Sequence, residues 1–525
     1  GQRKCVKCKE AEPVVVIRAG DAFCRDCFKA YYVHKFRAVL GKNRLIFPGE
    51  KVLLAWSGGP SSSSMLWQVL ERLSRNSAKQ LRFLPGVVYV ETVGVGGLTP
   101  GPPVVGELGE KLARKLAPSS LISCCREGAA CGRSPEDRAE TLAEVQATLH
   151  SAGLPWHSVA LEEVFGLPPS VLRHLSQEPA AGDGAYKEAV NGFIQRQQVL
   201  GTQGASDSPS PVLREPTQPG PVRPPPAAQT EALVRLFSSV RTLTAKEELL
   251  QTLRTHLLLH VARTHGYSKV MMGDSCTRLA IKLLTNLALG RGAFLAWDTG
   301  FSDERHGDVV VVRPMREHTL KEVAFYNRLF TVPTVLTPTI STKAPEKASI
   351  HRLMEAFVLQ LQAQFPSTVS TVYRTSEKLV KAPRAGQAPS HSSPHCLLCL
   401  CTLDVDCADS ATAFGAQATL VLPQRQPPNP QAEMPTAPGG PPALGRDQSC
   451  CRETGPSQRE GPRPHVLEQL CYGCRVNMKD LSSLDPLPPY ILSEAQLRSH
   501  RAQVTQEIQE FLIEDSEEEL ETGLS

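Results

Sequence analysis

The sequence lacks any uninterrupted run of 18 apolar residues, which is about the length that a transmembrane helix needs. Its first residues, Gly-Gln-Arg-Lys-Cys, also lack the apolar core of a secretory signal peptide. An excess of one charge is absent too, because 57 basic and 53 acidic residues leave a net charge of only +4. This balance gives no general argument for nucleic-acid binding, so any RNA-binding surface must be local. These features indicate a cytosolic or nuclear protein with no membrane partner, and of the two we expect a cytoplasmic one.

The composition indicates several folded domains joined by linkers. A chain of 525 residues is long enough for two to four domains, and its hydrophobic content of 41% is typical of globular proteins. The 43 prolines are clustered, which indicates linkers between folded parts. In a reducing compartment the 16 cysteines stay as thiols, so Cys-x-x-Cys pairs favour metal binding over disulfides.

Two cysteine pairs occur near the start of the chain. Thiolates two residues apart form a tight knuckle, and two knuckles can close a tetrahedral zinc site. Residues 13–18 between the pairs are typical of a short strand, and residues 19–22 of a turn. A redox pair is the alternative. The pattern predicts an N-terminal zinc ribbon with a basic helix over residues 1–45, and its expected ligands are Cys5, Cys8, Cys24 and Cys27.

The helix that follows this ribbon carries basic side chains interleaved with aromatic ones. Such a pattern suits an RNA backbone. The alternative is a solvated helix face, held to the core by Phe28, Tyr32 and Phe36. The candidate RNA-binding residues are Lys29, Lys35, Arg37, Lys42 and Arg44.

Residues 51–72 have the pattern of an anion-binding loop. The apolar run over 52–56 predicts a buried strand, and Ser57-Gly58-Gly59 predicts a tight turn into a helix. Glycines let the backbone approach a phosphate, and the N–H groups and dipole at a helix N-terminus attract negative charge. A serine-rich turn with no ligand is the alternative.

Further strands and helices alternate along the chain. Strands are expected at residues 81–91, 156–161, 269–273 and 308–315, and helices at 135–150, 244–265, 279–292 and 320–326. Residues 244–247 resemble a capping box that opens the long helix. The alternation predicts an α/β fold with a doubly wound parallel sheet over residues 46–380, which binds ligands at the carboxyl ends of its strands. Residues 92–126 and 181–230 interrupt it as insertions.

A second set of cysteine pairs predicts a C-terminal zinc ribbon over residues 381–493. Its ligands would be Cys396, Cys399, Cys471 and Cys474, although Cys401, Cys407, Cys450 or Cys451 could compete. Residues 422–464 are rich in proline, glutamine and glycine, so we interpret 402–465 as a disordered insertion within one metal site. A helix and an acidic tail are expected over 494–525.

These motifs resemble the PP-loop ATP pyrophosphatases, which adenylate a substrate and release pyrophosphate. Ser57-Gly58-Gly59-x-Ser61-Ser62 is similar to the family loop Ser-Gly-Gly-x-Asp-Ser, with serine in place of aspartate. The family's second signature, Gly-His-Asn-x-Asp-Asp, corresponds here to the stretch 273–278, in which Thr277 and Arg278 replace both carboxylates. The resemblance implies an adenine nucleotide alpha-hydrolase-like fold. It also implies that ATP or AMP would contact Ser57, Gly58, Gly59, Ser61, Ser62 and Gly273.

The later motifs are similar to the tRNA-thiolase branch of that family. Arg313-Pro-Met315 and Lys321-Glu-Val-x-x-Tyr326 resemble its Arg/Lys-Pro-Leu and Lys-Glu-Val-x-x-Tyr. Thiolases of this branch carry cysteines near the start of the long central helix. This chain has no cysteine between 131 and 276, and Cys276 stands alone at a turn, where core packing is the simpler account.

The resemblance implies a divergent partner subunit, with no catalytic residues of its own, in a heterodimer with a catalytic tRNA thiolase. The complex would thiolate position 2 of the wobble uridine in lysine, glutamine and glutamate tRNAs, with sulfur from a thiocarboxylated ubiquitin-related modifier. One alternative is an adenylating sulfurtransferase that uses Ser61 and Asp274 in altered geometry. Another is a zinc-ribbon RNA-binding adaptor with no role in thiolation.

Overall fold

The computed structural model describes residues 4–73, 81–91, 135–173, 186–195, 225–340, 344–379, 395–403 and 466–509, apart from isolated positions within these ranges. The predicted insertion at 92–126 and the acidic tail after residue 509 lie outside the described residues. So do nearly all of the insertion at 402–465 and the spare cysteines Cys407, Cys450 and Cys451.

A six-stranded sheet forms the centre of the molecule. Its strand order is β5-β4-β3-β6-β8-β7. Five strands run parallel, as the sequence predicts, but the edge strand β7 pairs antiparallel with β8, so the sheet is mixed. A strand of two residues is too short to show a period, and for that reason the sequence did not reveal it. The bounds are β3 Lys51–Ala55, β4 Leu84–Glu91, β5 Trp156–Ala160, β6 Lys269–Met272, β7 Ser302–Asp303 and β8 Val310–Val312.

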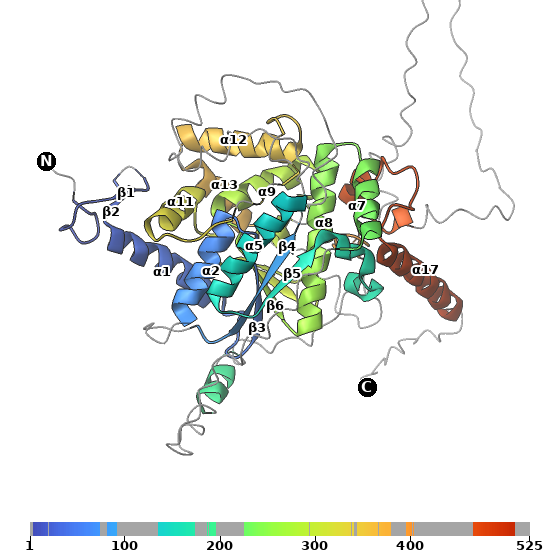
Figure 1. Ribbon diagram of the computed structural model, residues 1–525, viewed down its shortest axis with the longest axis horizontal. Coiled ribbons are helices and arrows are strands. Elements are labelled where there is room, and N and C mark those ends of the chain that lie inside the picture. Colours follow the sequence, from blue (N-terminus) through green and yellow to red (C-terminus); the bar gives the residue numbers. More distant parts are fainter. Residues whose placement is uncertain are drawn as a thin grey trace, which may run out of the picture.

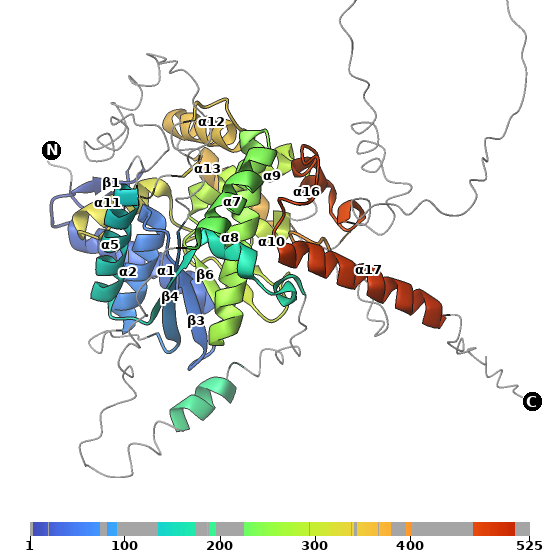
Figure 2. The same ribbon diagram turned by 45° about the vertical axis from the view of Figure 1, so that its right-hand side comes forward.

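Helices cover both faces of this sheet (Figures 1 and 2). One face is covered by α1 (Arg25–Asn43), α2 (Pro60–Leu73), α5 (Pro135–Ala152) and α11 (Leu320–Leu329). The other is covered by α7 (Ala227–Ser239), α8 (Leu243–His265), α16 (Tyr472–Asn477) and α17 (Pro489–Gln509), with the short 3-10 turns η2 (Leu161–Gly166) and η3 (Pro169–Leu172). Among the described residues, none of these helices is long and apolar enough to cross a membrane.

The alternation of side chains in β3 explains the two layers. Val52 and Leu54 belong to the core beneath α2, whereas Leu53 belongs to the core beneath α8, and all three are fully buried. Successive side chains of a strand point to opposite faces, so an apolar run of this kind requires helices on both sides. The doubly wound arrangement therefore follows from the apolar run over residues 52–56.

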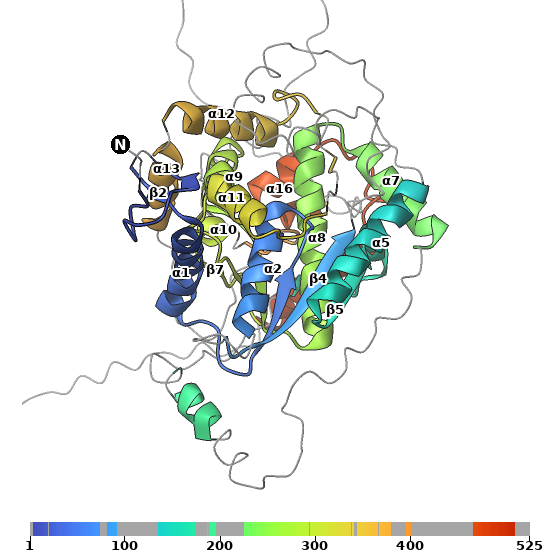
Figure 3. The same cartoon turned by 60° about the vertical axis from the view of Figure 1, so that its left-hand side comes forward.

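A third group of helices packs beside the sheet. It consists of α9 (Cys276–Ala288), α10 (Leu295–Thr299), α12 (Ile350–Gln364) and α13 (Thr368–Glu377), and α12 lies along the upper edge of the view in Figure 3. Cys276 is 4% exposed within the apolar cluster that α9 shares with α12 and α13, and burial raises its pKa to about 12. This position agrees with core packing, because the reactive form of a cysteine is the thiolate.

The segment before α8, and the cap of α8 itself, differ from what the sequence predicts. Part of the expected insertion 181–230 is helical, since residues 188–195 form a helix and α7 begins at Ala227. The long helix α8 is capped by Thr242, whose hydroxyl accepts the N–H of Ala245 at 3.2 Å. The expected cap, Thr244, instead accepts the N–H of Ile350 at 3.0 Å, because α12 docks there.

Candidate functional site

The glycine loop and the second signature meet at the carboxyl ends of two central strands of the sheet. Strands β3 and β6 are neighbours, and the chain leaves β3 toward β4 on one side but leaves β6 toward β8 on the other. This reversal is the place where open α/β sheets bind ligands, at the carboxyl ends of the strands. Ser57-Gly58-Gly59 follows β3, and Gly273 follows β6. The structure therefore brings the predicted nucleotide-binding residues together.

Gly273 allows these two segments to touch. A Cβ atom at this position would lie 2.8 Å from the Cα of Ser62 and 2.9 Å from its backbone nitrogen. Real Cβ atoms do not approach other atoms so closely, so only glycine lets the end of β6 lie against the start of α2. Gly273 thus has a packing role that does not depend on any ligand.

The hydroxyl groups of the loop bond mainly within the loop. The Ser62 hydroxyl accepts the N–H of Ser57 at 3.2 Å and lies 3.1 Å from the Ser57 hydroxyl. The Ser63 hydroxyl donates to the carbonyl of Gly58 at 3.2 Å and accepts the indole N–H of Trp56 at 3.0 Å. A serine-rich helix start can therefore be satisfied here without a bound phosphate.

The chain after α11 crosses the glycine loop. The N–H of Val335 donates to the carbonyl of Gly58 at 3.0 Å, and the hydroxyl of Thr337 donates to the carbonyl of Ser57 at 3.0 Å. Gly58 has a φ of 78°, and a Cβ there would lie 2.8 Å from the carbonyl oxygen of Val335. Sequence reasoning missed this covering segment. The available signal was its prolines, Pro333 and Pro338, which favour extended chain before them.

The residues that follow β6 offer no unpaired carboxylate at the two signature positions. The carboxylate of Asp274 pairs with Arg313, whose Nε lies 3.3 Å away. The hydroxyl of Thr277 accepts the N–H of Leu320, so that position holds the start of α11. Burial lowers the pKa of Arg254, the charge of Arg278 lowers it further, and Tyr89 and Asp274 act in the opposite direction. Because Mg²⁺ prefers carboxylate oxygens, the residues at these positions do not form a magnesium site.

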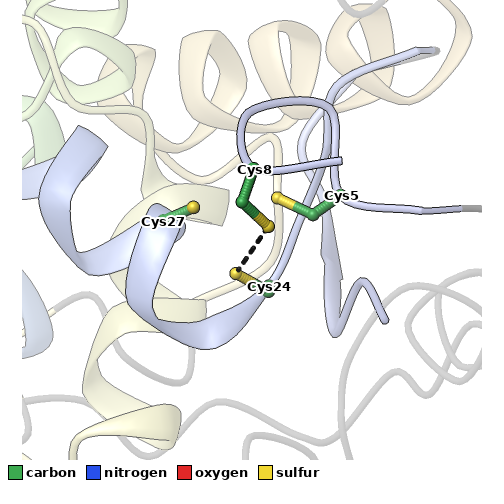
Figure 4. Close-up of side chains that lie close together, drawn as sticks. All are labelled: Cys5, Cys8, Cys24 and Cys27. Atoms are coloured by element: carbon green, nitrogen blue, oxygen red, sulfur yellow. Dashed lines mark hydrogen bonds between the residues drawn. The ribbon is translucent and has the colours of Figure 1, made fainter. Parts of the chain in front are cut away.

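The four N-terminal cysteines converge (Figure 4). Their Sγ atoms all lie within 4.8 Å of one another, and those of Cys8 and Cys24 are 3.9 Å apart. Burial raises the pKa of Cys5, but the backbone N–H groups of Cys24, Cys8 and Lys7 outweigh it and lower the pKa to about 6. Backbone N–H groups that stabilise a thiolate are what a metal knuckle requires.

The geometry of both cysteine clusters fits a tetrahedral metal ion. Zinc–sulfur bonds of about 2.3 Å imply sulfur–sulfur separations of about 3.8 Å. In the second cluster Cys399 and Cys471 lie 3.6 Å apart, and the N–H of Cys471 points to the sulfur of Cys396 at 3.3 Å. This cluster, with Cys474 as its fourth thiol, joins positions 72 residues apart, as the split ribbon predicts. Each cluster could bind a metal ion.

Cys401 is not a member of the second cluster. Its sulfur accepts an N–H of Arg305 at 3.0 Å, and Arg305 is itself paired with Asp298 and Asp303. Burial raises the pKa of the Cys401 thiol well above its ordinary value. Cys401 thus lies beside Cys399, but it bonds to Arg305 and is not one of the four converging thiols.

The five candidate RNA-binding residues do not share one environment. The ammonium of Lys35 lies 2.7 Å from the carboxylate of Glu322 and only 20% of its side chain is exposed. Lys29 pairs with Glu71 at 2.8 Å but stays 41% exposed. Phe28, Tyr32 and Phe36 are fully buried and hold α1 to the core. Lys42 and Arg44 are exposed at the C-terminal end of α1, and Arg37 is half-buried. RNA binding by these residues stays a prediction.

Comparison with known proteins gives consistent matches. A family model described as cytoplasmic tRNA 2-thiolation protein 2 matches residues 349–476. The Bos taurus protein of that name is 68% identical and the Homo sapiens protein 66%; the alignments cover 100% and 99% of this chain and 95% of each relative. The Danio rerio protein is 46% identical over 98% of this chain and 95% of its own length.

Among solved structures, one similar chain is the U34-tRNA thiolase NcsA from Methanococcus maripaludis with its [4Fe-4S] cluster. It is 13% identical, and the match covers 71% of this chain and 86% of that one at a TM-score of 0.39.

Proposed function

Because the chain belongs to the cytoplasmic tRNA 2-thiolation protein 2 family and so has a role in cytoplasmic tRNA 2-thiolation, we propose that it is the non-catalytic subunit of a heterodimeric tRNA thiolase. Its partner would be the catalytic subunit, which activates the wobble uridine of lysine, glutamine and glutamate tRNAs. A thiocarboxylated ubiquitin-related modifier would supply the sulfur to that partner. This chain would contribute RNA-binding surface and a stable framework.

One observation carries the proposal: the crevice has lost the groups that adenylation needs. Serine stands at position 61, and Thr277 and Arg278 stand where the related enzymes have carboxylates. The acidic group that remains, Asp274, is held by Arg313. The start of α8 has no cysteine that could receive sulfur. We infer that the glycine loop binds ATP or AMP weakly or not at all, since the segment through Val335 lies across it.

We further propose that each cysteine cluster holds one structural zinc ion. Cys5, Cys8, Cys24 and Cys27 would hold the first, and Cys396, Cys399, Cys471 and Cys474 the second. Four protein thiolates complete a tetrahedral shell, and a zinc ion bound in this way stabilises the fold and leaves no position for substrate. The thiols of the second cluster are nearly all buried, which fits a structural role.

Removal of the chain tests its role directly. We expect 2-thiouridine to disappear from tRNA in cells that lack it, and both wild type and Ser61→Ala to restore the nucleoside fully, as measured by mass spectrometry. Ser61→Ala is preferable to a change at Gly58, because a side chain there would collide with Val335 and could unfold the loop. Unchanged thiolation without the chain would contradict the proposal.

The same variants distinguish a non-catalytic subunit from one whose glycine loop takes part in adenylation. If wild type restores thiolation but a folded Ser61→Ala does not, the loop takes part in the reaction. Pyrophosphate release by the purified chain alone would support the same conclusion. We expect neither result, because Asp274 is paired with Arg313, and Thr277 and Arg278 stand at the positions where carboxylates would hold magnesium.

The exposed end of α1 provides the candidate RNA contact. Replacing Lys42 and Arg44 together by alanine should weaken tRNA binding and lower the slope of log affinity against log salt by about two, or one per phosphate contact. Arg235→Ala is the matched control, because its side chain is 65% exposed on α7. A binding curve measured from low to moderate salt checks this, and an unchanged slope in the double variant would rule out these contacts.

A further inference from the structure

The second cysteine cluster lies against an arginine, only 14% exposed, that has no part in the glycine loop. Arg291, just after α9, packs over Gly473, which lies between Cys471 and Cys474. A Cβ atom at Gly473 would collide with the Nε, Cγ and Cδ atoms of Arg291. The missing side chain at Gly473 thus leaves room for a guanidinium group directly on the metal knuckle.

This arginine also connects the knuckle to two other helices. Its Nη1 donates to one carboxylate oxygen of Glu248 on α8, and the second oxygen lies 2.6 Å from Nε2 of His351 on α12. Glu248 is 7% exposed, so the network is buried at its centre. His351 and Cys474 lie near opposite ends of the family-matched segment 349–476, and the network joins those two ends.

One N–H group of the network has no partner. The Nε atom of Arg291 is buried and makes no hydrogen bond to the described residues. Burial alone would lower the pKa of Arg291, but Glu248 and the charges of Cys474, Cys399 and Cys471 raise it. An unpaired buried donor is costly, so its position beside thiolates calls for an explanation.

A metal centre explains it. Four thiolates around a divalent ion carry a net charge of about −2, and such a charge is stable in a buried place only when it is compensated. Arg305 is already matched by two carboxylates, Asp298 and Asp303, whereas Arg291 has only Glu248, which it shares with His351. Arg291 is therefore a cation whose charge is available to the cluster.

We propose that Arg291 is a positioning residue of the C-terminal metal site: its guanidinium compensates the thiolate charge, its Nε–H is the donor for the cluster, and Glu248 and His351 couple metal binding to α12. This inference rests on the zinc-binding part of the proposed function. The N-terminal cluster offers an internal control, because Arg291 packs over Gly473 in the knuckle of the second cluster.

The test compares three variants of the full chain. Arg291→Met removes the charge at similar length, Arg291→Lys keeps the charge but not the planar fork of donors, and Arg235→Met removes an exposed arginine of α7. Zinc per chain is measured after equilibration with increasing chelator. Loss of a partner of this kind typically lowers metal affinity about 10- to 100-fold. We expect Arg291→Met to lose one of its two zinc ions at a correspondingly lower chelator concentration than wild type. Arg291→Lys should lose it at a concentration between those of Arg291→Met and wild type. Arg235→Met should lose zinc at the wild-type concentration.

Two further readouts distinguish this role from simple loss of packing. In the cobalt-substituted protein, the sulfur-to-cobalt absorption should move to longer wavelength in Arg291→Met, because the thiolates lose a nearby positive charge. Backbone amides of α12 should exchange hydrogen faster in both Arg291→Met and Glu248→Gln. Retention of the N-terminal metal shows that the variants remain folded.

The outcomes are separable. If wild-type protein contains no zinc, the zinc-binding part of the proposed function is wrong, and this inference with it. If wild type contains two zinc ions and Arg291→Met keeps both at the wild-type chelator concentration with an unshifted cobalt spectrum, only the assignment of Arg291 is overturned.

Discussion

Replacing Cys474 by serine is expected to remove one of two zinc ions and to release the C-terminal segment from α8. The cluster connects residues 396–401 to residues 466–509, and both belong to the core around α8 that includes Leu398, Leu470 and Ile491. A structural zinc site contributes its binding free energy to folding, which amounts to about 10 kcal/mol or more in small zinc domains. Without the metal, the two segments, which are distant in sequence, are no longer joined by shared coordination of one ion.

Metal analysis and limited proteolysis would measure this effect. We expect about one zinc per chain in Cys474→Ser, and rapid cleavage within residues 466–509, which wild type resists. Cys401→Ser is the matched control: it removes a buried thiol beside the cluster but should keep two zinc ions, since Cys401 is not one of the four converging thiols. Loss of zinc from Cys401→Ser with retention in Cys474→Ser would reverse the assignment of ligands.

The second large effect is expected at Glu322. Its carboxylate accepts the ammonium of Lys35 at 2.7 Å, the hydroxyl of Tyr31 at 3.0 Å and the N–H of Thr319 at 2.8 Å. Glu322→Gln leaves Lys35 without a counter-charge in a site where it is only 20% exposed. Breaking a buried pair from one side costs about 3–5 kcal/mol, and we expect about 3 kcal/mol because Lys35 keeps some contact with water.

Thermal unfolding at neutral pH would detect this change as a midpoint lower by about 4–5 °C, because the unfolding entropy of a large domain makes each kcal/mol count for fewer degrees. Lys29→Ala is the control, because its pair with Glu71 is exposed and surface pairs contribute about 0–1 kcal/mol. An equal effect of the two substitutions would contradict the difference in burial. The comparison also affects how RNA binding is tested. Weaker tRNA binding by a Lys35 variant would reflect lost stability of the fold rather than a lost RNA contact.

The pH dependence of this pair has a definite sign. Burial raises the pKa of Glu322, but Lys35 and the N–H of Thr319 outweigh it and hold the pKa below its ordinary value of 4.5. The stabilisation is therefore complete above pH 4.5 and is lost as the pH falls through the lower folded pKa. The difference in stability between wild type and Glu322→Gln should stay constant from pH 5 to 8 and shrink in more acidic solution.

Local patterns were sufficient to predict the parallel strands of the sheet, the glycine loop and the two cysteine clusters, but not the antiparallel edge strand β7. An apolar run such as 52–56 can only be buried on both faces, and a Cys-x-x-Cys pair forms a knuckle wherever it folds. The absence of carboxylates at positions 61, 277 and 278 is likewise visible in the sequence. The proposed non-catalytic role depends on these missing carboxylates, and the relatives place the chain in the thiolation family.

The partner of each charged side chain was decided by the tertiary structure. Lys35 read as a candidate RNA contact, yet Glu322, 287 positions away, pairs with it when α11 packs on α1. Asp274 is held by Arg313, and Arg291 packs on the cysteine knuckle while it pairs with Glu248. The segment through Val335 covers Gly58 only because α11 ends beside the loop. Spacing along a chain determines which residues share an element, whereas the strength of an ion pair depends on burial and distance, and only packing sets both.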